Sequence, residues 1–294
     1  GQPDIIYTEF VSAEGLWRIK KRGEMNHKIW RDLIYSEIER PVIAQIFGSD
    51  PESFYEAAKI ICELGFDGID INMGCPSPGL EKRGGGAGLI RDKCNAVEVV
   101  EATRRGVVDF FDSVRDAQKS CSDPTALRLR GPLARDFVST SAPFKKTELI
   151  PVSVKTRIGS ESSDEEWWKL LASMQMPAVA MHGRTFKQLY SGEADWEVLT
   201  RAAEIIRESG ALFLGNGDIK NFSDFDKYKD LMDGMLIGRA SIGNPWVLRR
   251  DSYVPSIEEK LRVAVEHVEK YDELFPGQPI FPMRKHLAKY ISGF

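Results

Sequence analysis

The sequence predicts an α/β fold of the (β/α)8 TIM-barrel type, because short apolar segments alternate with helical segments along most of the chain. Short β-branched runs that alternate with helices are typical of parallel β/α units. No G-x-G-x-x-G motif follows the first predicted strand, which disfavours an open, doubly wound sheet. Seven strands are predicted where a complete barrel needs eight over about 250 residues. We therefore expect the first β/α unit to be missing from this chain.

The predicted strands are short runs rich in Val, Ile, Ala and Leu. They are Ile5–Phe10, Val42–Phe47, Gly68–Asn72, Pro151–Thr156, Ala178–His182, Ala211–Asn216 and Gly234–Gly238.

Helix-start and helix-stop residues lie between these strands. Asp50 and Pro51 predict the start of one helix, and Gly65 predicts its end. Ser163, with an acid three residues later, predicts a capping box at the start of another. The remaining predicted helices are Asp195–Ser209, Ser223–Met232, Ser256–Leu274 and Arg284–Ile291.

Two domains are expected. Residues 1–250 would form the barrel, with an insertion at about 112–148 that contains Arg128, Arg130, Arg135, Lys145 and Lys146 against few acids. Residues 251–294 would be the start of a helical domain that is cut short.

The overall composition favours a cytoplasmic protein and excludes little else. The chain has 294 residues, of which 42% are hydrophobic and 29% charged, and its net charge is −4. No apolar run reaches the roughly 18–20 residues of a membrane span. The four cysteines show neither C-x-x-C spacing nor a disulfide pattern, which indicates a reducing compartment and no cysteine metal site. Any nucleic-acid contact must use a local basic face.

Cys75 lies in a Gly- and Pro-rich loop after the third predicted strand, and the glycine run Gly84-Gly85-Gly86 follows it. A loop at the C-terminal end of a strand places a thiol where it can touch a ligand. Most free cysteines are instead small buried hydrophobes. The position alone leaves both interpretations open.

Polar residues near four strand ends are predicted to meet at one mouth of the barrel: Gln45, Asn72, Lys155 and His182. An inward-pointing lysine is costly to bury unless it meets an anion or an electron-rich ring. The alternative for Lys155 is an ion pair with Asp70, and the alternative for His182 is a satisfied core histidine.

Two later loops combine glycine with polar residues and are expected to bind phosphate, as loops after strands seven and eight of TIM barrels do. They contain Asn216, Gly217, Asp218, Gly238 and Arg239.

These motifs together resemble the tRNA-dihydrouridine synthase family. The matching segments are D-G-I-D-I-N-M-G-C-P, G-G-G-A-G-L, V-K-T-R-I-G, H-G-R-T, G-N-G-D-I and I-G-R-A, in this order along the chain. The resemblance implies an FMN-binding barrel, followed by a helical RNA-binding domain, that reduces particular tRNA uridines with NADPH or NADH. Reduced FMN would give a hydride to C6 of uracil, and Cys75 would give a proton to C5.

Other roles follow from the same match, position by position. Gln45, Lys155 and His182 match residues along the flavin ring, and the two glycine loops match the ribityl-phosphate site. Asn72 and Arg184 match positions near the ring and the substrate. The charges of Arg83, Arg284 and Lys285 make them candidates for tRNA phosphates, although most such charges form an ordinary solvated surface. We expect no metal ion, no membrane association and a monomer.

Three departures from the family pattern leave two other functions open. The N-terminal A-P-M-x-G-V-T segment is absent, the insertion is not a family feature, and the helical domain is short. One alternative is another FMN-barrel oxidoreductase that acts on free pyrimidines. The other is a non-catalytic RNA-binding descendant. Bound flavin would argue against the second, and activity on free uracil would favour the first.

Overall fold

The computed structural model describes residues 3–24, 27–120, 148–251 and 253–291, without the side chains of 117–120. The chain divides into two compact units. The larger is Asp4–Gly215, and the smaller comprises Asn216–Phe294 together with Gly1–Pro3.

The larger unit is built on parallel strands in chain order. They are β1 (Ile6–Tyr7), β2 (Val11–Ser12), β3 (Val42–Phe47), β4 (Gly68–Asn72), β5 (Val152–Arg157), β6 (Ala178–His182) and β7 (Leu212–Asn216). The sheet order is β1-β3-β4-β5-β6-β7, with β2 also paired to β3. A doubly wound sheet would reverse direction at a switch point, and this order does not. The fold is therefore a parallel α/β fold of the TIM-barrel type.

The first predicted strand, Ile5–Phe10, is corrected to two shorter ones. Tyr7 of β1 pairs with Ile43, and Val11 of β2 pairs with Ile46. The first segment therefore carries one residue more than β3 between these pairs, as in a β-bulge. Within that interval the hydroxyl of Thr8 accepts a hydrogen bond from the backbone N–H of Gln45 at 3.1 Å. The extra residue interrupts the pairing of the first segment with β3, and the segment still lies beside β3 on both sides of the interruption.

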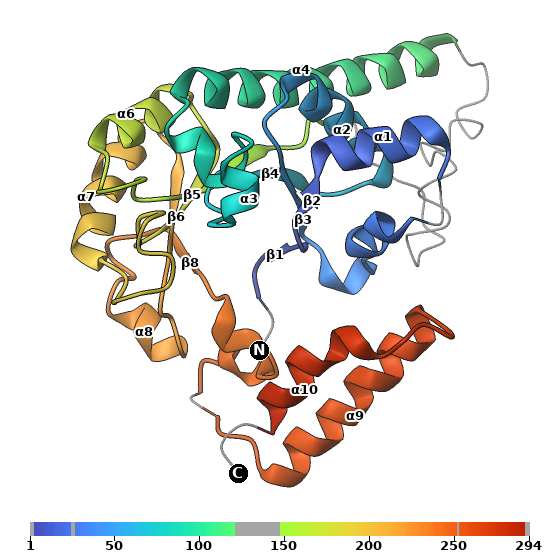
Figure 1. The fold of residues 1–294 in the computed structure, drawn as a ribbon, viewed down its shortest axis with the longest axis vertical. Coiled ribbons are helices and arrows are strands. Elements are labelled where there is room, and N and C mark those ends of the chain that lie inside the picture. Colours follow the sequence, from blue (N-terminus) through green and yellow to red (C-terminus); the bar gives the residue numbers. More distant parts are fainter. Residues whose placement is uncertain (1–2, 25–26, 121–147, 252, 292–294) are drawn as a thin grey trace. The chain divides into compact units, whose positions relative to one another are not determined.

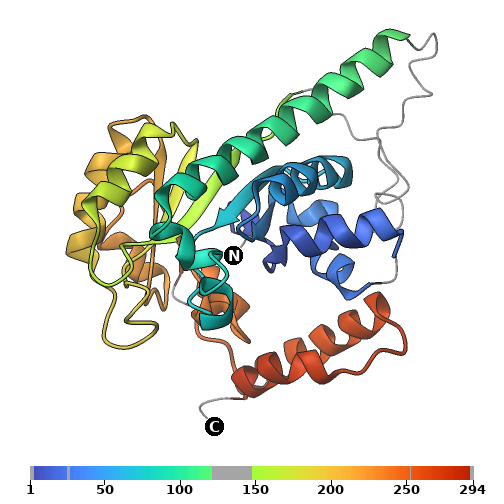
Figure 2. The ribbon, with the colours of Figure 1, turned by 45° about the horizontal axis from the view of Figure 1, so that its top comes forward.

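Helices cover the outside of these strands. They are α1 (Ala13–Arg22), α2 (Pro51–Leu64), α3 (Pro78–Glu81), α4 (Lys93–Ser120), α6 (Glu165–Ser173) and α7 (Trp196–Arg207). Helix α2 packs between α1 and α4, and α6 packs against α7 (Figures 1 and 2). Leu16 of α1, Phe54 of α2 and Trp167 of α6 are fully buried.

Local capping explains where the predicted helices begin. Asp50 caps α2, accepting from the N–H of Ser53 at 3.0 Å, and Gly65 ends this helix at φ 84°, as predicted. The capping box predicted at Ser163 is wrong. Asp164 is the N-cap of α6, because its carboxylate accepts the N–H of Trp167 at 3.0 Å.

Helices α1 and α4 were not predicted. Helix α4 extends to Ser120, into the insertion expected at 112–148. The basic residues from Arg128 to Lys146 lie outside the described residues.

The smaller unit contains α8 (Phe222–Asp226), β8 (Gly234–Leu236), α9 (Ile257–Leu274) and α10 (Arg284–Tyr290). Helices α9 and α10 pack together, as their rings show: the His267 and His286 centroids are 5.0 Å apart. Gly243 lies against α10 at φ 65°, where an added Cβ would come within 2.7 Å of the N atom of Tyr290.

The two C-terminal helices are close to the predicted ones, and Ser256 caps α9. The helix predicted over Ser223–Met232 is corrected, because α8 ends at Asp226 and turns follow. Within the part of the chain that the structure describes, no helix is both long enough and apolar enough to cross a membrane.

Candidate functional site

Cys75 is half-buried directly after β4, and its backbone is held on several sides. The side-chain Oδ1 of Asn72 accepts hydrogen bonds from the N–H of Cys75 at 2.8 Å and of Gly74 at 3.1 Å. The carbonyl of Cys75 accepts the N–H of Ala87 at 3.3 Å. The predicted loop is therefore a turn fixed by hydrogen bonds, and Cys75 stays partly exposed within it.

The glycines around Cys75 allow the backbone segments to approach each other closely. Gly86 has φ 57°, and a Cβ there would lie 3.1 Å from the Cβ of Cys75. A Cβ on Gly74 would lie 3.1 Å from the backbone carbon of Thr156 on β5. These contacts explain why glycine occupies position 86, at the end of the run Gly84-Gly85-Gly86, and position 74, directly before Cys75.

A chain of buried side-chain hydrogen bonds continues from Asn72 across three strands. The Nδ2 of Asn72 donates to the Oε1 of Gln45 at 2.8 Å, and the Nε2 of Gln45 donates to Asp70 at 2.7 Å. The hydroxyl of Ser153 donates to the other Asp70 oxygen at 2.7 Å. Register explains the grouping, because Gln45, Asp70 and Ser153 are neighbours across β3, β4 and β5.

Burial governs the charges in this cluster. It raises the pKa of Asp70 to about 6, an effect opposed by the hydrogen bonds from Ser153 and Gln45 and by the charge of Lys155. Burial lowers the pKa of Lys155, while Asp70 opposes that shift. The alternative for Lys155 was an ion pair with Asp70. Asp70 does act on Lys155 through its charge, whereas the hydrogen bonds to its carboxylate oxygens come from Gln45 and Ser153.

Arg157 is a residue of the site that the sequence analysis did not single out. It is 3% exposed. Its Nε donates to the carbonyl of Gly74 at 2.8 Å, and its Nη1 donates to the carbonyls of Thr185 at 2.9 Å and Leu189 at 3.0 Å. Arg157 thus ties the Cys75 loop to the loop after β6. Its same-face spacing with Lys155 was the available signal.

The other residues predicted near the ring and the substrate are buried. His182 ends β6, with 8% of its surface exposed. Arg184 is 2% exposed and donates from Nη2 to the carbonyl of Gly192 at 2.6 Å and from Nε to that of Ser191 at 3.2 Å. The structure thus gives Arg184 a role in holding the loop at 191–192, and its substrate role stays a prediction.

The residues expected to bind phosphate lie in the smaller unit. Gly217 and Asp218 have φ 130° and 56°, a turn conformation that suits glycine at the first position. Arg239, with its side chain 59% exposed, pairs with Asp218 at 3.1 Å. The Nδ2 of Asn216 donates to the carbonyl of Leu236 at 2.8 Å. An added Cβ on Gly238 would meet nothing within 4 Å.

The three candidates for tRNA phosphates are exposed. Arg83 follows α3 in the larger unit, whereas Arg284 and Lys285 begin α10 in the smaller one. The guanidinium carbon of Arg284 lies 4.8 Å from the centroid of the Phe281 ring. Among the described residues, no cluster of three or more His, Cys, Asp or Glu side chains is arranged to hold a metal ion.

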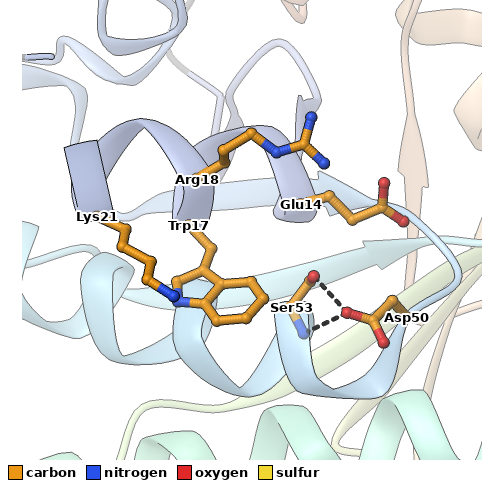
Figure 3. Close-up of a pocket in the computed structure, with 6 residues that line it drawn as sticks. All are labelled: Glu14, Trp17, Arg18, Lys21, Asp50 and Ser53. Carbon is orange, nitrogen blue, oxygen red and sulfur yellow. Dashed lines mark hydrogen bonds between the residues drawn. The ribbon is translucent and has the colours of Figure 1, made fainter.

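A pocket of about 320 Å³ lies between α1 and the start of α2 (Figure 3). Its lining combines Trp17, whose ring centroid is 5.5 Å from the Lys21 ammonium, with the capping pair Asp50 and Ser53. Glu14 and Arg18 complete the lining, and none of the predicted site residues contributes to it.

Comparison with known proteins gives a family match over most of the chain. The sequence model of a family described as "Dihydrouridine synthase (Dus)" matches residues 1–111 and 138–294. Similar curated proteins include "Probable tRNA-dihydrouridine synthase 2" of Bacillus subtilis, 27% identical over 302 residues that cover 100% of this chain and 79% of that protein. The "Probable tRNA-dihydrouridine synthase" of Staphylococcus epidermidis is 29% identical, covering 99% of this chain and 78% of that protein. With the match of the family model over both segments, the chain belongs to the dihydrouridine synthase family.

Proposed function

We propose that this protein reduces specific uridines of tRNA to 5,6-dihydrouridine. The family match carries the proposal, and the half-buried Cys75 at the end of β4 gives it a chemical centre. The similar proteins of Bacillus and Staphylococcus bear names that state the same activity. Four cysteines without a disulfide pattern, and tRNA as the substrate, favour the cytoplasm.

The cofactor we propose is FMN, with NADPH or NADH as the reductant. Reduced FMN supplies the hydride that C6 of the uracil ring needs. The chemistry of the side chains at the strand ends fits such a ring. Gln45 and Asn72 each carry a side-chain NH2 with two N–H groups, one of which is used in the buried chain. The second N–H of each is available to donate to a ring carbonyl, and Lys155 and His182 would complete the lining.

For the phosphate end of FMN we propose the loops that contain Asn216, Gly217, Asp218, Gly238 and Arg239. The exposed guanidinium of Arg239 supports this role, since arginine binds phosphate through two parallel hydrogen bonds. Phosphate would compete with Asp218 for this group. The open space around Gly238 leaves room for the ligand to approach the backbone.

Cys75 is the proposed acid. Its thiol gives a proton to C5 as C6 receives the hydride, so the uracil ring gains two hydrogen atoms and the thiolate recovers its proton from solvent. Asn72 and Arg157 hold the Cys75 loop through the Cys75 N–H and the Gly74 carbonyl. Arg83 in the larger unit, and Arg284 and Lys285 on the helical segment, are the proposed phosphate contacts of tRNA, with Arg184 near the target nucleotide.

The test is a map of dihydrouridine in tRNA. Unmodified tRNA is incubated with the protein, FMN and NADPH, and mass spectrometry then locates each nucleotide that has gained 2 Da. New dihydrouridine at defined positions supports the proposal. Reduction of free uracil without reduction of tRNA would indicate a pyrimidine oxidoreductase. Binding of tRNA by a protein that retains no flavin would indicate a non-catalytic RNA-binding protein.

A further inference from the structure

Asp70 is a buried carboxylate that the proposed chemistry does not use. It lies at the centre of β4, between β3 and β5, and is 0% exposed. One of its oxygens accepts from Gln45 and the other from Ser153, both at 2.7 Å. Burying a carboxylate is costly even with such partners, and a neutral polar residue would pack here at lower cost.

Three hydrogen bonds link Cys75 to Asp70 through two side-chain amides, and all three run from donor to acceptor in the same direction. The N–H of Cys75 donates to Asn72 at 2.8 Å, Asn72 donates to Gln45 at 2.8 Å, and Gln45 donates to Asp70 at 2.7 Å. Each side-chain amide accepts at its oxygen and donates at its nitrogen. Both amides are therefore oriented the same way along the chain.

The two ends of this chain require that direction. An ionised carboxylate can only accept hydrogen bonds, so Gln45 must turn its nitrogen toward Asp70. A backbone N–H can only donate, so Asn72 must turn its oxygen toward Cys75. If Gln45 were flipped, its nitrogen would face the nitrogen of Asn72, and two donors would oppose each other. A residue without an acceptor at position 70 would remove the partner that holds the Gln45 amide at this end.

We propose that Asp70 is a positioning residue, whose carboxylate fixes the orientation of the Gln45 and Asn72 amides and thereby the backbone of the Cys75 loop. Its consequence for turnover rests on the proposed role of Cys75 as the proton donor. The effect of Asp70 on the backbone of the Cys75 loop does not depend on that role, because it involves only hydrogen bonds within the protein.

Neighbouring groups limit the rise in the pKa of Asp70 that burial causes. Burial raises its pKa to about 6, and the charge of Lys155 on β5 opposes that shift. Gln45 on β3 and Ser153 on β5 donate hydrogen bonds to it. Tyr7 on β1 is a further titratable group near Asp70, and its pKa is raised by burial and by the Asp70 charge.

The experiment compares Asp70→Ala and Asp70→Leu, which both lack the acceptor for Gln45, with Ser153→Ala as a matched control. Ser153→Ala also removes a buried hydrogen bond to Asp70, but from the oxygen that does not bind Gln45. The readout is amide hydrogen exchange of Gly74 and Cys75 at pH 7, in protein whose fold is verified by circular dichroism. We expect exchange to be about tenfold faster in Asp70→Ala and in Asp70→Leu, and unchanged in Ser153→Ala.

Should Asp70→Ala not fold, Asp70→Leu decides the question, because leucine has nearly the shape of aspartate but no acceptor for the Gln45 N–H. Unchanged exchange in the folded Asp70→Ala or Asp70→Leu variant, or equal acceleration in Ser153→Ala, would overturn the proposal. A second readout is kcat on tRNA, which we expect to fall about tenfold in Asp70→Ala with KM unchanged. If Cys75→Ala retains full turnover, the donor assignment fails, while the exchange data still decide whether Asp70 positions the loop.

Discussion

The side-chain oxygen of Asn72 accepts the backbone N–H of Cys75 at 2.8 Å, so the residue that ends β4 also holds the loop that follows it. This bond makes the position of the thiol depend on the strand rather than on the loop alone. Catalytic groups carried by rigid elements hold their geometry better than groups on free loops. The predictions below test how this arrangement is maintained and what it does.

Replacing Gly86 with Ala is expected to displace Cys75. The new Cβ would lie 3.1 Å from the Cβ of Cys75 and 2.9 Å from a Leu80 methyl, at a φ of 57° that alanine adopts poorly. We expect a loss of about 1–3 kcal/mol in the free energy of unfolding and at least a tenfold loss of tRNA reduction. Gly79→Ala is the control, because a Cβ there meets nothing within 4 Å. Full activity in the Gly86 variant would show that the thiol tolerates displacement.

Arg157→Lys should weaken the connection between the Cys75 loop and the loop after β6. Lysine cannot reproduce the three hydrogen bonds to the carbonyls of Gly74, Thr185 and Leu189. We expect unfolding by urea to show a loss of about 1–3 kcal/mol, together with a lower kcat on tRNA.

Arg104→Lys separates these two effects. Arg104 also binds loop carbonyls, those of Met174 and Gln175 at the end of α6, in contacts that do not involve the Cys75 loop. We expect the Arg104→Lys variant to have a lower free energy of unfolding and an unchanged kcat on tRNA. An equal loss of kcat in both variants would mean that Arg157 acts on stability alone.

Asp70 is expected to make the stability of the protein fall as pH rises from 4 to 7. The pKa of Asp70 is about 6 in the folded state, against an ordinary value of 3.8. Between pH 3.8 and about 6, the folded protein therefore keeps a proton that the unfolded chain has released. This group alone should lower the free energy of unfolding by up to about 3 kcal/mol over that interval. Asp70→Asn lacks this contribution. Urea unfolding across the pH range should therefore show the wild type losing stability relative to the variant, and parallel curves would contradict the raised pKa.

Arg239→Ala should weaken FMN binding by about 1.5–3 kcal/mol, the size of a charge-assisted contact. Equilibrium dialysis measures this as a rise in Kd of roughly tenfold to a hundredfold. Arg249→Ala removes a cation of the same unit whose partner is Asp251, and is expected to leave Kd unchanged. If the Arg239 variant binds FMN as tightly as the wild type does, the phosphate lies elsewhere.

The strands that carry the site could be predicted closely from the sequence. The bounds of β3, β4 and β6 are those expected, because apolar β-branched runs end there in polar residues and turns. The bounds of α2 follow from Asp50 and Gly65. Helix α4 was missed, although Ala96, Val99 and Val100 begin a helical apolar stripe that is fully buried. The apolar periodicity of this segment is itself typical of a helix.

The contacts within the site could not be predicted in the same way. Arg157 binds backbone carbonyls, which every residue carries, so the identities of Gly74, Thr185 and Leu189 give no sign of that contact. Asp70 meets Gln45 and Ser153 only because of the strand register, and a slip of one residue would turn it to the other face. The roles of the predicted residues toward FMN and tRNA stay predictions.

Cys75→Ala tests the central claim most directly. The substitution removes the proposed acid and leaves the backbone N–H that binds Asn72 in place. Cys94→Ala, at an exposed thiol on α4, is the matched control. The measurement is the rate of dihydrouridine formation in tRNA under single-turnover conditions, with bound FMN and its reduction by NADPH measured in parallel. We predict intact FMN binding and reduction and a turnover lower by about 10²–10⁴, the range for a lost general acid. Turnover at the wild-type rate in the Cys75 variant would contradict the account.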